Sequence, residues 1–272
     1  ASRTAQFRGF ILNQQRKAAD GAIAMLRGAD LDPGALRQQA TASFAVSRLG
    51  LRDEAIRIWP YPNAERIFVD FNEPEQWLPI AMEHHESSPG DPDTIPPVAF
   101  AYLLSGDAAS AKEWANRYLE QLDEPQRPIS FINDIFAIDA WRRGASEELE
   151  KIIAPMEQAQ NVQSDAGLDM SGMYINEAWW AQMRGDKNTA AAMMEKALSR
   201  NTVRRDELDL SYRIMGWDQD PRMLDIKAEY DDYVAAERSK FLAYACGEVG
   251  FQLWKPLDST CKEVDRASPV PL

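Results

Sequence analysis

Apolar residues recur at three- and four-residue spacing along most of this 272-residue chain, which is the period of an amphipathic α-helix. The clearest runs cover residues 101–119, 129–143 and 177–198. The nearest candidate for strand-like alternation is residues 66–71, and both of its flanks have the helical period. The pattern predicts an all-α fold.

Signals for helix ends lie between these runs. Asp32-Pro33 and Asp220-Pro221 each place a capping carboxylate before a proline in a first helical turn. Five apolar stretches end at a glycine, which tolerates the left-handed backbone that often ends a helix: Gly50, Gly106, Gly144, Gly185 and Gly216. We therefore expect short helices joined by tight turns.

The first four of these glycines share a pattern of neighbours. The residues seven positions earlier are small: Ser43, Ala99, Ala137 and Ala178. Five positions after the glycines stand Ala55, Ala111, Leu149 and Ala190, small in all but Leu149, and nine positions after them stand the apolar residues Trp59, Ala115, Ile153 and Met194. Antiparallel helices approach closely only where their side chains are small, so each set predicts a helical hairpin with its crossing point at the small pair. One hairpin cannot bury both of its faces, so several must stack.

These hairpins resemble the tetratricopeptide repeat (TPR) family, in which pairs of helices repeat about every 34 residues. The best matches are residues 99–119 and 178–198, which share the small residue, a Gly-Asp turn and an alanine on the second helix. Weaker units surround Gly50 and Gly144, where Ala145 replaces the usual acid, and the spacing between glycines exceeds that of the family. The resemblance implies a right-handed superhelix of antiparallel helix hairpins, a TPR-like α-solenoid.

This interpretation divides the chain into an N-terminal helix at 1–31, repeats at 32–219, and a capping helix with a cysteine-containing tail at 220–272. The proline-rich stretch 87–97 is either a boundary between subdomains or a long loop between two helices. Residues 220–246 have the apolar stripe of one long helix: Met223, Leu224, Ile226, Tyr230, Val234, Phe241, Leu242 and Ala245. Residues 223–261 also resemble the end of helical-repeat regions in bacterial signalling proteins, including membrane-anchored regulators.

The TPR resemblance implies a concave groove lined by the first helix of each pair. The aromatic or apolar residues at the groove positions are Phe44, Phe100, Ile138, Trp141 and Trp179, and the polar ones are Asn133, Asn176 and Gln182. Such a groove suits an extended peptide or a helix, with aromatic anchors and amide groups for the peptide backbone. The alternative is that the bulky members pack between neighbouring hairpins.

Composition removes several classes of function. The formal net charge of −13 opposes binding to nucleic acid and to anionic lipid, and no apolar run is long enough to span a bilayer. The two histidines, His84 and His85, are adjacent and point about 100° apart on a helix, so they do not form a metal-binding pair. There is no glycine-rich phosphate loop and no recognisable nucleophile motif. We expect no catalytic residue, no metal and no cofactor.

The only two cysteines, Cys246 and Cys261, lie 15 residues apart near the C-terminus. They form either a disulfide, which would place the protein in an oxidising, extracytoplasmic compartment, or two free thiols in the cytoplasm. Residues 1–12 are too polar for the core of a signal peptide, and we expect any targeting segment to lie upstream or to have been removed.

The sequence thus predicts a non-enzymatic module that binds a protein or peptide. The alternatives are a hydrolase or lyase that works through carboxylate pairs such as Glu147/Glu150, and a self-associating scaffold.

Overall fold

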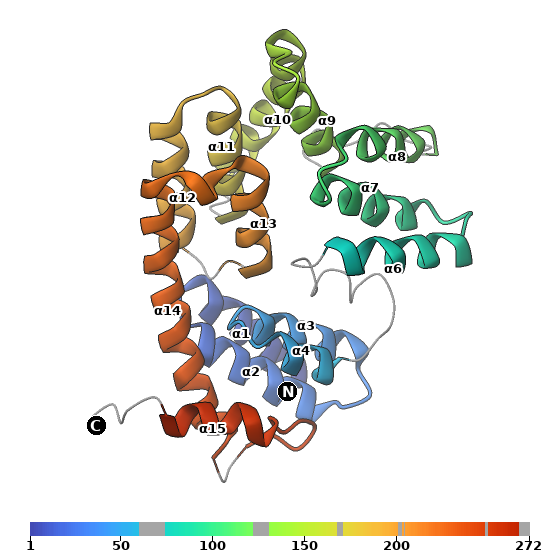
Figure 1. Ribbon diagram of the computed structural model, residues 1–272. Coiled ribbons are helices and arrows are strands. Elements are labelled where there is room, and N and C mark those ends of the chain that lie inside the picture. Colours follow the sequence, from blue (N-terminus) through green and yellow to red (C-terminus); the bar gives the residue numbers. More distant parts are fainter. Residues whose placement is uncertain are drawn as a thin grey trace. The chain divides into compact units, whose positions relative to one another are not determined.

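The computed structural model of the chain describes residues 1–59, 74–121, 131–167, 171–200, 203, 205–247 and 250–266. Every regular element in these ranges is a helix (Figure 1). The predicted all-α fold is therefore confirmed for the described residues. The strand candidate at 66–71 lies outside them.

The chain forms two compact units, which are described separately. The first consists of Ala1–Tyr61, Leu198–Leu208 and Asp220–Leu272, and the second of Pro62–Ala197 and Asp209–Gln219. The segments 1–31 and 220–272 thus fall in one unit, and the expected repeat segment 32–219 is divided between both. The grouping differs from the expected one because a C-terminal helix packs on an N-terminal helix, a contact between residues about two hundred positions apart.

The first unit begins with α1 (Ser2–Gln14), α2 (Ala18–Leu31), α3 (Leu36–Ser47) and α4 (Arg52–Ile58), each packed on the next. Residues 1–31 were expected to form one helix and form two, because the chain turns at Arg16, where φ is 52°. The α1–α2 crossing depends on glycine. A Cβ on Gly9 would lie 2.9 Å from the carbonyl oxygen of Gly21, closer than side-chain atoms tolerate.

The first unit is completed by α14 (Pro221–Ala245) and α15 (Asp258–Arg266). The expected long helix is confirmed, with the Asp220 carboxylate accepting hydrogen bonds from the first N–H groups of α14. All but one of the predicted stripe residues are buried; Leu224 is 44% exposed because it lies one position off the buried face. α14 packs along α2, where the Glu237 carboxylate accepts a hydrogen bond from the Ala19 N–H at 2.8 Å.

The second unit contains α6 (Pro74–Ser87), the 3-10 helix η1 (Pro92–Thr94), α7 (Ile95–Leu104), α8 (Ala108–Glu120), α9 (Phe131–Arg142) and α10 (Ser146–Asp165). It continues with α11 (Ser171–Met183), α12 (Lys187–Arg200), α13 (Arg205–Met215) and the 3-10 helix η2 (Trp217–Gln219), although its boundary with the first unit runs through α12 and α13. From α6 to α11 each helix packs on the next, and Figure 1 shows α6, α7 and α8 side by side.

The stretch 87–97 is an ordered connection between α6 and α7. Asp91 caps η1 by accepting a hydrogen bond from the Asp93 N–H at 3.0 Å, and Thr94 Oγ1 lies 2.8 Å from His85 Nδ1 on α6. Both of its flanks belong to the second unit. These contacts favour the loop between helices over a boundary between subdomains.

The predicted hairpin turns are present. All five turn glycines have positive φ, between 69° and 86°. At Gly106, Gly144 and Gly185 the glycine N–H donates to the carbonyl three positions earlier, and the next N–H donates to the carbonyl five positions before itself. This repeated bonding satisfies the last carbonyls of the first helix and reverses the chain.

The predicted crossing points are buried. All twelve residues that flank the four turn glycines at the shared positions are at most 7% exposed. In the α3–α4 hairpin the Ser43 hydroxyl donates to the carbonyl of Ala55 at 2.8 Å, so the two predicted small residues touch. In this hairpin the small pair therefore lets the two helices approach closely.

Two of the second helices carry the same N-terminal cap. The Asp107 carboxylate accepts hydrogen bonds from the backbone and hydroxyl of Ser110, and that of Asp186 accepts them from the hydroxyl and backbone of Thr189. These bonds lower the pKa of both carboxyls. The N-cap of α10 is Ala145, which offers no side-chain acceptor.

Candidate functional site

The apolar groove positions lie mainly in helix packing. Phe44 and Phe100 are half-buried, and their rings meet Trp59 and Trp77 edge-on at 6.0 and 6.1 Å between centroids. Ile138 is fully buried. Burial thus favours the packing alternative at Ile138, whereas Phe44 and Phe100 pack against a neighbouring ring and keep part of their surface exposed.

Trp141 and Trp179 differ in exposure. Trp141 on α9 is partly exposed, and Trp179 on α11 is only 8% exposed. Among the apolar members of the second unit, Trp141 and Phe100 therefore retain surface that a partner can touch. Phe44 belongs to the first unit and the other seven positions to the second.

The polar groove positions are partly exposed, and two of them bind neighbouring helices. Asn176 donates to the side-chain oxygen of Gln160 on α10 at 3.3 Å, and Gln182 donates to the carbonyl of Met215 on α13 at 3.2 Å. Asn133 lies on α9. The structure thus brings Asn176 to a polar cluster that the sequence did not indicate.

That cluster borders an open pocket of about 370 Å³ between α10, α11 and α12. Glu157, Gln160 and Asn161 of α10 line it, together with Glu177, Trp180, Ala181 and Arg184 of α11, and Asp186 and Thr189 at the start of α12. Its volume falls in the lower part of the range usual for ligand sites, about 300–1,000 Å³. We call it the α10–α12 pocket.

Gln160 organises one wall of the α10–α12 pocket. Its side chain is 2% exposed, and its amide nitrogen donates to the Met173 carbonyl at 3.0 Å and to Glu177 Oε1 at 2.9 Å. A buried amide with both donor and acceptor satisfied holds its neighbours in fixed positions. The Glu177 carboxylate is therefore oriented by α10 although it is carried by α11.

Arg184 is occupied by two acids of α10. Its guanidinium donates twice to Glu150, at 2.8 Å each, and also binds both carboxylate oxygens of Glu157. Hydrogen bonds from Arg184 lower the pKa of Glu150, and the two acids raise the pKa of Arg184. This clamp ties α10 to α11 and leaves the arginine little capacity for an anionic ligand.

Glu177 and Trp180 keep unused hydrogen-bonding capacity. Glu177 Oε2 has no hydrogen bond or ion pair within the described residues, and neither does the indole N–H of Trp180, a residue that is 2% exposed and lines the pocket. The pocket therefore offers a carboxylate oxygen and an N–H donor to a ligand.

Asp134, an acid outside the pocket, has a raised pKa. Burial raises the pKa of Asp134 on α9 to about 7. Asp134 does not line the α10–α12 pocket. In the parts of the chain that the structure describes, no group of histidine, cysteine and acidic residues is arranged to hold a metal ion.

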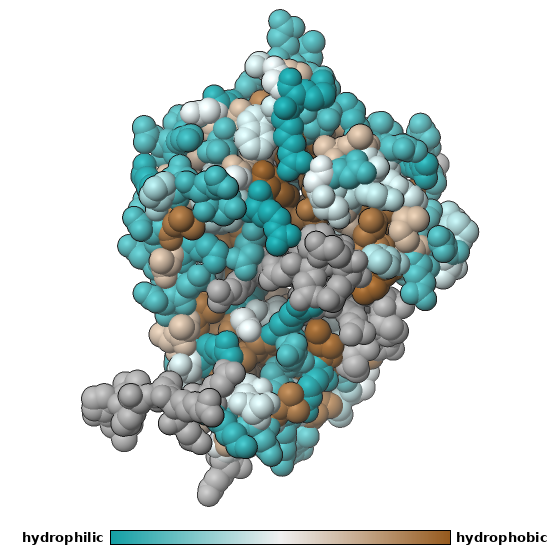
Figure 2. Space-filling view, viewed as in Figure 1, coloured by the Kyte–Doolittle hydropathy of each residue, from teal (hydrophilic) through white to brown (hydrophobic). Residues whose placement is uncertain are grey.

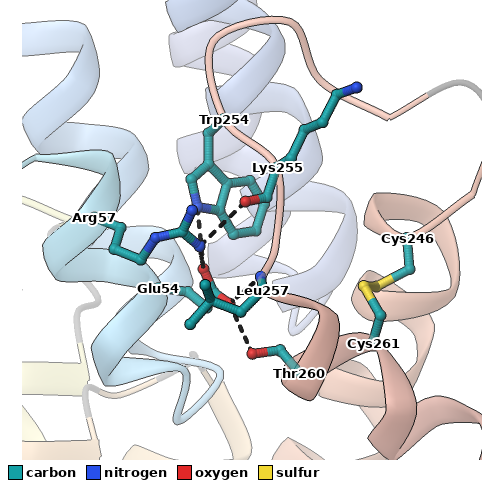
Figure 3. The surroundings of a disulfide bond; sticks show 8 residues. All are labelled: Glu54, Arg57, Cys246, Trp254, Lys255, Leu257, Thr260 and Cys261. Carbon is teal, nitrogen blue, oxygen red and sulfur yellow. Dashed lines mark hydrogen bonds and ion pairs between the residues drawn. A yellow bond between two sulfur atoms is a disulfide. The ribbon is translucent and has the colours of Figure 1, made fainter.

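In the first unit, Cys246 and Cys261 form a disulfide, as one of the two sequence alternatives expected (Figure 3). The neighbouring tail is bound by Glu54 of α4, whose side chain is 2% exposed. One carboxylate oxygen accepts from the Leu257 N–H at 2.8 Å and the Thr260 hydroxyl at 2.7 Å; the other accepts from the Trp254 indole at 3.2 Å and Arg57 at 2.7 Å. The disulfide and Glu54 thus hold the tail at separate points.

Comparison with known protein families and with curated proteins finds no match for this chain. Among the helices in the described ranges, none has both the length and the apolar character that crossing a bilayer demands.

One signal in the sequence does point to the pocket. On α10 the buried positions are Leu149, Ile153, Met156 and Gln160, so a polar amide continues an apolar stripe. A polar residue at a core position implies a polar partner on the helix that packs there. The identity of that partner is set by packing between helices and is not visible in the sequence alone.

Proposed function

We propose that this chain is a non-enzymatic interaction module of TPR-like helical hairpins that holds a protein or peptide segment. The observation that carries the proposal is the open, polar α10–α12 pocket, which lies between the second helix of one hairpin and both helices of the next. Consecutive packing from α6 to α11 and the repeated turns support a stacked arrangement, and stacked hairpins typically present extended binding surfaces.

The right-handed superhelix belongs to this proposal, with Trp141 and Phe100 as the partly exposed aromatic members of its groove. Such residues anchor partners because they bury a large area at low cost in conformational entropy. In this proposal the groove and the α10–α12 pocket bind successive parts of one segment.

The compartment is part of the same proposal. Disulfides persist mainly in oxidising compartments, so the Cys246–Cys261 bond supports an extracytoplasmic location. The resemblance of residues 223–261 to bacterial signalling proteins further supports a role as the repeat region of a membrane-anchored regulator. Mass spectrometry of protein purified from its source without reductant tests the location. A chain heavier by two hydrogen atoms than the disulfide form would argue against it.

A random-peptide phage display on the full chain tests the binding function. Asn161→Trp places a bulky side chain at the exposed rim of the α10–α12 pocket, and Gln158→Trp makes the same change at an exposed position of α10 outside it. We expect selected peptides to bind the Asn161→Trp variant at least about tenfold more weakly than the wild type and to bind the Gln158→Trp variant normally. Failure to enrich any peptide would refute the proposed function.

Self-association is a second candidate, supported by α1. Phe7, Phe10 and Ile11 are 67%, 45% and 44% exposed and share one helix face. On the face drawn in Figure 2, hydrophilic residues predominate and hydrophobic ones occur in small separate groups. Light scattering over a range of concentrations tests this candidate, and a mass that stays monomeric would exclude it.

The hydrolase or lyase alternative has weaker support. Asp134, with its pKa near 7, is suited to acid–base chemistry, but it does not line the α10–α12 pocket. A catalytic carboxyl has to reach the substrate, so Asp134 does not make the α10–α12 pocket a catalytic site.

A further inference from the structure

We infer that the α10–α12 pocket recognises a cationic side chain, that of lysine or arginine, in the bound segment. This inference rests on the proposed function and specifies the ligand chemistry of the same pocket. It follows from the charge of the lining, from the unused polar groups and from the pocket's volume.

The lining has a surplus of negative charge. Glu157, Glu177 and Asp186 are acids, and Arg184 is the single basic residue among the lining groups. Arg184 is already shared between Glu150 and Glu157, and a further acid, Glu150, thus lies next to the pocket. An anion entering the pocket would meet no available cation, whereas a cation would gain favourable Coulomb energy.

Glu177 is the acid best placed to receive that cation. One of its oxygens is held by Gln160, and the other has no partner within the described residues. Because the carboxylate is already oriented, a ligand cation binds it with little loss of side-chain freedom. Hydrogen bonds to charged groups contribute more than neutral ones, so this contact should provide much of the affinity.

Trp180 supplies the second contact. Its indole N–H has no partner within the described residues, although the side chain is almost fully buried against the pocket. An N–H donor at this point suits a main-chain carbonyl of the bound segment, and an indole beside a carboxylate is a favourable surrounding for an organic cation. A lysine or arginine residue within a peptide provides both groups.

The volume of the α10–α12 pocket also fits a cationic side chain. A pocket of about 370 Å³ admits one long side chain and part of its backbone but not a folded element. An organic cation is favoured over a bare metal ion, because the described residues contain no group of metal-binding side chains.

NMR titration of the full chain with N-acetyl-arginine methylamide tests the inference. The indole N–H signals of the eight tryptophans are followed, with Trp180→Phe to assign the relevant one. We expect the Trp180 signal to shift and saturate. The citrulline analogue has the same shape without the charge, and we expect it to bind at least about tenfold more weakly.

Two protein variants complete the design. Glu177→Gln should weaken arginine binding at least about fivefold, and Glu147→Gln, an exposed acid at the start of α10, should leave it unchanged. Equal shifts with arginine and citrulline, or unchanged affinity in the Glu177→Gln variant, would overturn the inference. The citrulline comparison needs no protein variant and so does not depend on how Glu177→Gln folds.

The outcomes separate this inference from the proposed function. Peptides from phage display that lack lysine and arginine and do not depend on Glu177 would refute the cation pocket while supporting peptide binding. Saturable, charge-dependent binding of the arginine derivative, in a protein that enriches no peptide, would support the cation pocket and refute the peptide function.

Discussion

Replacing Glu54 should release the C-terminal tail even while the disulfide is intact. Glu54 is buried and accepts four hydrogen bonds, three of them from the tail (Figure 3). Glu54→Gln keeps the shape of the side chain but places an NH₂ group where one oxygen accepted bonds. Either Trp254 and Arg57 or Leu257 and Thr260 then lose their acceptor.

The expected cost follows from those lost bonds. A buried donor left without an acceptor costs about 1–3 kcal/mol, so two of them would cost about 2–6 kcal/mol. We expect the lower part of that range, about 2–4 kcal/mol in the free energy of unfolding, because Arg57 is 41% exposed and the Leu257 and Thr260 donors are only partly buried, so water replaces part of what is lost. Glu54→Ala removes all four bonds and leaves a cavity, and we expect about 3–5 kcal/mol. The matched control is Glu229→Gln, an exposed acid on α14 in the same unit.

Two measurements check this prediction. Urea unfolding gives the free energy, and hydrogen–deuterium exchange over residues 250–262 reports the tail directly, since the Leu257 N–H is one of the bonded donors. Repeating both with Cys246 and Cys261 replaced by serine shows whether the two attachments are coupled. A 15-residue loop predicts about 3 kcal/mol for the disulfide alone. A loss below about 1 kcal/mol for Glu54→Gln, with unchanged exchange, would refute the reasoning.

Three further predictions concern the second unit. Burial opposes ionisation of Asp139, but hydrogen bonds from Arg143 and Lys112 outweigh burial and lower the pKa of Asp139. The ionised carboxylate therefore stabilises the fold fully above about pH 4, and this stabilisation is lost as the pH falls through the lowered pKa. Urea unfolding should therefore separate wild type from Asp139→Asn at pH near 6 and bring them together near pH 2; a constant difference would contradict this. Ala145→Ser supplies the missing side-chain cap of α10 and should raise the free energy of unfolding by about 1 kcal/mol in the same assay. No gain would show that a serine at this position does not cap α10. Trp179→Ala should cost about 3–5 kcal/mol because the side chain is buried, whereas a small loss with abolished peptide binding would make Trp179 a groove residue.

The sequence was sufficient to predict the helical hairpins because the signals for them are local. A glycine at the turn, a small residue on each side and an acid after the glycine all act within about twenty residues. Gly106 with Asp107 and Gly185 with Asp186 show the full set, and the structure has the expected backbone and caps at both. The disulfide was one of two alternatives from the sequence for a similar reason, since the chain has only two cysteines and they lie close in sequence.

The remaining features depend on contacts that no local pattern encodes. Glu54 lies in an ordinary helical run, and nothing near it in the sequence indicates partners about two hundred residues away. The packing of α14 on α2 is equally long-range. The α10–α12 pocket arises where Gln160, Glu177 and Arg184 from separate helices meet, so its outline depends on how the hairpins stack.

The first unit is built from segments far apart in the sequence, and this has a consequence for its folding during synthesis. It combines the beginning of the chain with its last helices, whereas most of the second unit is one continuous segment between them. On the ribosome, α1 to α4 therefore emerge long before α14 and α15, and the apolar surface of α2 that α14 covers stays open during that interval. The first unit therefore cannot be completed until α14 and α15 have been synthesised, and until then its early helices expose an apolar surface that can aggregate or bind a chaperone.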